Sequence, residues 1–187
     1  MPRIRTVAAL TTAAALAAPA VASAHVTVNP STAAPGSFSI LTVRVPNERD
    51  NKGSNKVVLN LPDGFFSLSY KKVPGWVIKP TKTKLDKPVD VDGFQADEQF
   101  TRVTFTARRD GVIRPGQFEE FPLSVRIPTG KKGDVLAFPA IQTYQGGEVV
   151  RWTGAPNSDT PAPRVTLTSP SAGAAGLVGA DTAGRFR

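Results

Sequence analysis

The chain has 187 residues and carries 23 Lys and Arg residues against 15 Asp and Glu residues, a formal net charge of +8 at pH 7. It contains no cysteine, one histidine and one methionine, which is Met1. This composition excludes disulfides, thiolate zinc sites, cysteine catalysis and every metal site that needs two or more histidines.

The N-terminal segment has the three parts of a secretory signal. Two arginines precede an alanine-rich apolar run at residues 7–18, and residues 22–24 form the small-x-small pattern of a cleavage site. The apolar run is shorter than the roughly 20 residues of a membrane-spanning helix. We therefore expect residues 1–24 to be a signal peptide, the mature chain to begin at His25, and the protein to be exported.

Export changes what the positive charge implies. Outside the cytoplasm the available polyanions are wall polymers and lipid headgroups, so nucleic acid is not expected as a partner. The basic residues are also scattered rather than interleaved with aromatic side chains, which is more typical of a solvated surface than of a binding stripe.

Cleavage before His25 would give that residue a second nitrogen donor. Its free α-amine and its ring Nδ1 could close one chelate ring on a metal ion. Nitrogen donors in tetragonal geometry suit Cu(II), and no thioether or thiolate remains once Met1 is removed with the signal. The sequence therefore predicts a Cu(II) site built on His25.

After residue 24 the chain shows short alternating apolar runs separated by Pro and Gly, and no amphipathic helix. This pattern predicts an all-β fold, an antiparallel β-sandwich with a single domain over residues 25–168, followed by a flexible low-complexity tail at 169–187. The expected strands cover residues 26–28, 38–45, 56–61, 67–71, 76–78, 100–107, 121–127, 135–144, 149–152 and 164–167.

Five segments occur in an order that resembles the YcnI-like family of exported copper-binding proteins. They are the stretches at 24–30 (AHVTVNP), 43–48 (VRVPNE), 73–76 (VPGW), 118–121 (FEEF) and 142–152 (QTYQGG through RW). The resemblance implies an immunoglobulin-like or fibronectin-like sandwich with a Cu(II) site on one histidine. It assigns His25 as the terminal ligand, Trp152 as the aromatic neighbour of the metal, and a carboxylate as a further ligand.

Three carboxylates compete for the last role. Glu120 is the first choice, Glu119 is the competitor, and Glu148 is a more distant third. Strand alternation places Glu119 on the side of Phe121 and Glu120 on the opposite side, but this alternation does not choose the ligand, because a functional site can lie on either face.

The resulting hypothesis is a non-catalytic Cu(II)-binding protein, a copper chaperone or uptake and homeostasis factor. Its expected partners are copper and other exported copper-handling or membrane copper-transport proteins, with the wall or membrane surface as a further candidate. A wall-associated interaction module without a metal is the alternative. A copper oxidative enzyme resembling lytic polysaccharide monooxygenases is less favoured, because it needs a second histidine. No transmembrane helix is expected in the mature chain as given.

Overall fold

The computed structural model describes residues 25–170, and within that range the chain forms twelve strands and no helix. The predicted signal peptide and residues 171–187 of the predicted tail lie outside the described residues. The strands are β1 (Thr27–Asn29), β2 (Thr32–Ala33), β3 (Phe38–Pro46), β4 (Ser54–Asn60), β5 (Leu68–Tyr70), β6 (Trp76–Val91), β7 (Phe94–Ala107), β8 (Phe118–Arg126), β9 (Val135–Ala137), β10 (Ala140–Tyr144), β11 (Val149–Trp152) and β12 (Arg164–Leu167).

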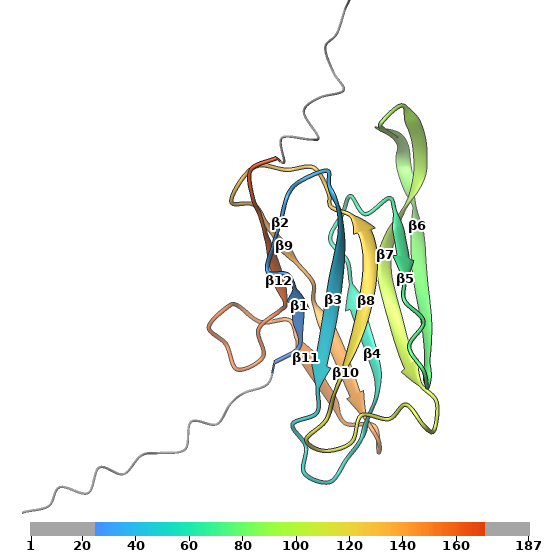
Figure 1. Ribbon diagram of the computed structural model, residues 1–187, viewed down its shortest axis with the longest axis vertical. Helices are drawn as coiled ribbons and strands as arrows, with labels where there is room; N and C mark the ends of the chain where they lie inside the picture. The colour runs from blue at the N-terminus through green and yellow to red at the C-terminus, as the bar shows by residue number, and fades with distance from the viewer. Residues whose placement is uncertain (1–24, 171–187) are drawn as a thin grey trace, which may run out of the picture.

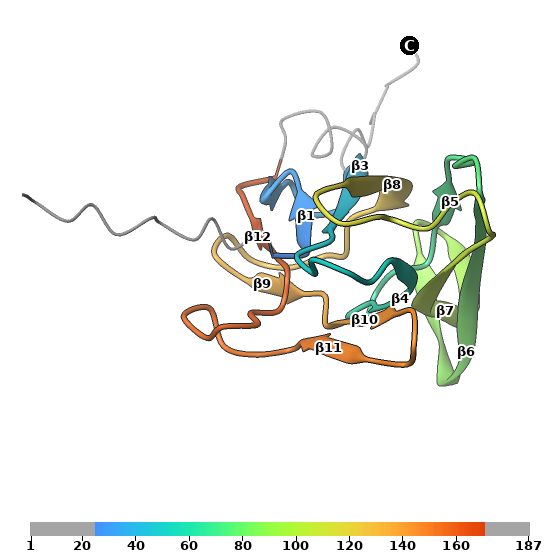
Figure 2. The ribbon, with the colours of Figure 1, turned by 90° about the horizontal axis from the view of Figure 1, so that it is seen from below.

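The strands form two main layers, which overlap in the view of Figure 1 and are seen apart in the view from below in Figure 2. One sheet has the order β1-β3-β8-β5, and the facing sheet has the order β11-β10-β4-β7-β6. A small third sheet, β2-β12-β9, lies along one side of the sandwich. Every strand pair is antiparallel except β2 with β12, so the predicted all-β antiparallel sandwich is confirmed with one parallel pair added.

Alternating residues of both sheets supply the core. Val43 and Val45 of β3 face inward and are fully buried, as are Val57 of β4 and Phe105 of β7. The ring of Phe105 stacks on that of Phe121 from the opposite sheet, with centroids 4.3 Å apart. Each such side chain contributes about 1.5–3 kcal/mol by leaving water, so this alternation holds the layers together.

The hairpin of β6 and β7 is longer than the sequence predicts. Beyond Pro80 its residues are mostly Lys, Thr and Asp, which carry no apolar alternation, yet they continue to pair up to Val91 and Phe94. A register shift opposite Thr81 and Lys82 places two apolar runs of β7 on one side. The extra residue keeps Phe100 on the core side with Val103 and Phe105, although three positions rather than two separate Phe100 from Val103.

The predicted strand at 135–144 is in fact two strands in different sheets. β9 pairs with β12 in the small sheet, whereas β10 pairs with β4 and β11 in the five-stranded sheet. Pro139 lies at the junction and has no N–H to donate to a ladder. The buried Phe138 beside it is 1% exposed, so the apolar pattern runs unbroken through a change of sheet.

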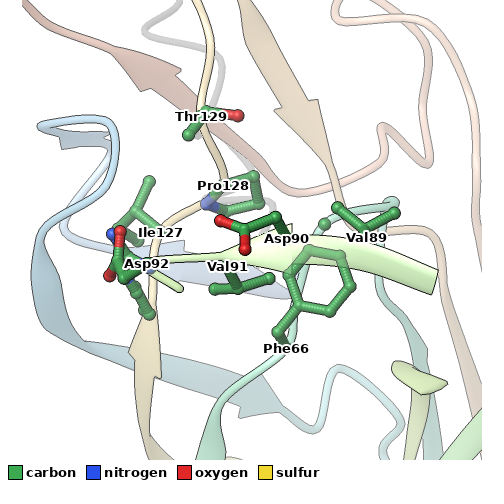
Figure 3. Close-up of a pocket in the computed structure, with 10 residues that line it drawn as sticks. Phe66, Val89, Asp90, Val91, Asp92, Ile127, Pro128 and Thr129 are labelled. Atoms are coloured by element: carbon green, nitrogen blue, oxygen red, sulfur yellow. The ribbon is translucent and has the colours of Figure 1, made fainter. Parts of the chain in front are cut away.

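A pocket of about 130 Å³ lies where the tip of the β6–β7 hairpin meets the end of β8. Figure 3 shows Asp90 and Asp92 of the hairpin beside Ile127 and Pro128. An ion pair between Asp92 and Arg126 joins the two segments. Because β8 runs away from this point for nine residues, the pocket lies at the far end of the sandwich from the level at which β1 begins.

Candidate metal site

His25 lies two residues before Thr27, where β1, the edge strand of the four-stranded sheet, begins. Val26 and Val28 are buried at 1% and 3% exposure, and β1 pairs with β3 so that Thr27 lies opposite Arg44. The two valines therefore fix the start of the chain against the core. His25 itself is partly exposed.

A groove of about 270 Å³ runs beside His25. Its walls come from β1, including Asn29, and from the segment that leads into β12, including Pro161 and Pro163. His25 thus lies at a groove between the edge strand β1 and the segment that precedes β12.

Trp152 approaches His25 from the opposite sheet. It ends β11, the edge strand of the five-stranded sheet, and is only 2% exposed. The centroids of the His25 and Trp152 rings are 5.5 Å apart and the rings are tilted by 57°. The structure therefore brings these two predicted site residues together where the two sheet edges meet.

The indole N–H of Trp152 is directed to a third residue, Gln142 of β10. Trp152 Nε1 donates to Gln142 Oε1 at 2.9 Å, and Gln142 Nε2 donates to the carbonyl oxygen of Pro46 at 2.8 Å and to Ser54 Oγ at 3.1 Å. Gln142 and Ser54 are both fully buried. Sequence reasoning missed Gln142, although its spacing by two from the buried Ala140 and Tyr144 places it on the inner face.

The three candidate carboxylates have different surroundings. Glu119 faces inward, is half-buried and accepts the backbone N–H of Glu120 at 3.0 Å. Glu120 is exposed opposite Arg44, and among residues 25–170 its carboxylate forms no ion pair or hydrogen bond. Glu148 binds Lys52 at 2.9 Å and Arg49 at 2.7 Å.

These positions separate the carboxylates from the histidine. Strand β3 lies between β1 and β8, so Glu120 is on a strand about 10 Å from β1 at the usual ladder spacing. The hydrogen bonds from Lys52 and then Arg49 lower the pKa of Glu148, which remains a charged partner of those cations. Within the described residues no group of three His, Asp or Glu side chains could hold a metal ion. The carboxylate role of Glu120 thus stays a prediction.

A family model described as "Domain of unknown function (DUF1775)" matches residues 25–167. The chain belongs to this family. A curated relative is the copper-binding protein CutI of Bacillus subtilis (strain 168), which is 35% identical over 148 residues. The alignment covers 79% of this chain and 64% of CutI, so the chain spans less than two thirds of that relative's length. These matches confirm the resemblance to the YcnI-like family.

A solved structure of another relative supports the architecture. A protein from Nocardia farcinica with an immunoglobulin-like fold matches 78% of this chain and 99% of its own, at 30% identity and a TM-score of 0.61. The immunoglobulin-like sandwich that the sequence predicts is thereby confirmed. Within residues 25–170 we find no helix able to cross a membrane.

The donors that His25 can offer a metal ion are nitrogens. Its imidazole has one, and a chain that begins at His25 would have a second in its α-amine. The indole of Trp152 is not a ligand, because its only polar group is a donor and is already bonded to Gln142. Trp152 instead places an apolar ring beside His25.

Proposed function

We propose that the protein is an exported Cu(II)-binding protein that captures or delivers copper outside the cytoplasmic membrane, as a chaperone or as an uptake and homeostasis factor. The observation that carries the proposal is the ring contact between His25 and Trp152 across the two sheet edges. The copper-binding relative at 35% identity supports the choice of metal.

In this proposal copper is cargo and the protein is not an enzyme. His25 holds Cu(II) through its amine and imidazole nitrogens, and Glu120 offsets part of the charge of the dication. Trp152 covers one side of the ion and limits the access of water and reductants. Other exported copper-handling proteins, or a membrane copper transporter, are the expected partners in transfer.

The test compares three proteins by Cu(II) titration and electron paramagnetic resonance. A chain beginning at His25 should bind one copper tightly. A chain with one extra residue before His25 loses the amine, and His25→Ala loses the imidazole. Each should bind more than about 100-fold more weakly, since a lost chelating ligand should cost more than the roughly 10–100-fold of an outer-shell change. Equal affinity for the extended and processed chains would refute the assignment of the α-amine as a ligand. Unchanged binding by His25→Ala would refute the copper site at His25.

A further inference from the structure

We propose that Gln142 is a positioning residue that holds the indole of Trp152 against His25 and, through it, controls how accessible bound copper is to reductants. The first half of this inference concerns the metal-free protein. The second half rests on the proposed function, since it requires copper at His25.

The orientation of the Gln142 amide is fixed by its partners. An indole N–H can only donate, so the amide atom 2.9 Å from Trp152 Nε1 must be the oxygen. A backbone carbonyl can only accept, so the atom 2.8 Å from the oxygen of Pro46 must be the NH₂ nitrogen. A flipped amide would lose both hydrogen bonds, so only one amide orientation is compatible with these partners. In that orientation the amide oxygen holds the indole N–H in one direction.

The same amide also ties the two sheets together at the level of His25. Gln142 belongs to the five-stranded sheet, whereas Pro46 ends β3 of the facing sheet. Thr27 lies opposite Arg44, and continuing this antiparallel register by two residues brings His25 level with Pro46. One side chain therefore fixes both the indole and the strand end beside which His25 lies.

Burial makes this link strong. Gln142 is 0% exposed and Trp152 is 2% exposed, so water does not replace either hydrogen bond at low cost. A buried polar group left without a partner is unfavourable, which penalises every arrangement in which the indole turns away from Gln142. Without the amide, packing alone would hold the ring, and the wall beside the metal would loosen.

The first experiment uses the metal-free chain that begins at His25. In nitrogen-15 NMR spectra, Gln142→Met should shift the Trp152 indole N–H resonance, speed its exchange with solvent and weaken the nuclear Overhauser contact between the His25 and Trp152 rings. The matched control is Ser54→Ala, which removes the other partner of the same NH₂ group but keeps the indole bond. It should leave both signals in place. An unchanged indole resonance and ring contact in Gln142→Met would overturn the inference.

A second variant covers the case in which Gln142→Met does not fold. Gln142→Glu keeps an acceptor for the indole N–H and, while its carboxylate is ionised, has no donor for the Pro46 carbonyl. It should retain the indole resonance near its parent position while altering the backbone signals of Pro46 and its neighbours. Loss of the indole bond in this variant with the Pro46 region unchanged would contradict the assignment of the two amide ends.

The copper arm is a double-mutant cycle on the rate of Cu(II) reduction by ascorbate. Gln142→Met and Trp152→Phe should each speed reduction by about tenfold, within the range of outer-shell effects. If Gln142 acts through Trp152, the double variant should be no faster than either single variant. Rates that multiply would show that Gln142 acts by another route. Failure of the parent to bind copper would refute the proposed function, while the NMR result would still decide the role of Gln142.

Discussion

Around His25, single side chains differ in what they can offer a metal. Trp152 has its N–H occupied, and Glu148 is held by two cations. Glu119 accepts a backbone N–H, whereas the Glu120 carboxylate has no hydrogen-bond or ion-pair partner in the described part of the chain. Availability thus favours Glu120, although its strand is not the neighbour of β1.

Charge-neutral substitution separates these carboxylates. Glu120→Gln keeps the side-chain shape and should weaken Cu(II) binding by about tenfold with a changed paramagnetic resonance spectrum. Glu119→Gln and Glu148→Gln are the matched controls and should leave both nearly unchanged. A silent Glu120→Gln beside a strong effect of either control would move the ligand to that residue and leave the histidine site intact.

Individual site residues could be predicted from the sequence where the residue type itself determines the chemistry. A unique histidine after a predicted cleavage site and a Trp in a family motif pointed to His25 and Trp152, and the structure brings them together. The inward side of Glu119 followed from alternation with Phe121, and its half-buried position agrees. The sequence could not identify Gln142 as a site residue. Its role depends on hydrogen bonds to partners from β3 and β11, and only the structure shows which residues these partners are.

Strands were predictable where burial imposes alternation. The 38–45 prediction nearly coincides with β3, whose inner residues are apolar. The outer half of the β6–β7 hairpin was missed because cross-strand pairing, not a core, sustains it. The change of sheet at Pro139 was missed because the residues on both sides of the proline, Ala137 and Phe138 before it and Ala140 after it, are apolar, so no polar residue marks the junction.

The turn before β6 makes a testable contact with the loop after β7. A Cβ at Gly111 would overlap the backbone of Gly75, whose carbonyl accepts the N–H of Arg108 at 2.7 Å. Gly111→Ala should therefore lower the free energy of unfolding by about 1–3 kcal/mol, as overpacking does. Asp110→Ala, at the exposed neighbouring position, is the control and should change it by less than about 0.5 kcal/mol. Equal urea midpoints for the two variants would show that the two loops can move apart without a loss of stability.

Over the whole molecule, the two ends of the sandwich are chemically distinct. One end holds the ring contact between His25 and the buried Trp152, whereas the far end carries the hairpin tip, joined to β8 by the ion pair of Asp92 and Arg126. The ladder from Phe118 to Arg126 separates them. Substitutions at the hairpin tip are thus expected to leave the candidate metal site unaltered.

The pH dependence of copper binding should reflect competition between protons and copper for the proposed nitrogen donors. Protons compete with Cu(II) for imidazole and amine, so affinity should fall as the pH is lowered from about 8 to about 5. Glu148, whose pKa is lowered by Lys52 and Arg49, stays ionised over this range, so its ion pairs do not contribute to the change. Calorimetric titration at several pH values checks this expectation. A flat profile would argue against His25 as the ligand.

The contact between His25 and Trp152 also has a consequence in time. The histidine stands at the beginning of the described chain and the tryptophan near its end, and β12, later still, packs beside β1. During synthesis, or during passage through a membrane with the N-terminus leading, His25 emerges long before Trp152. In the proposed function, copper bound at that stage would have the histidine donors but not the indole that covers them. A shielded copper site would therefore form only once the chain is complete, and truncated copies would hold copper exposed to reduction.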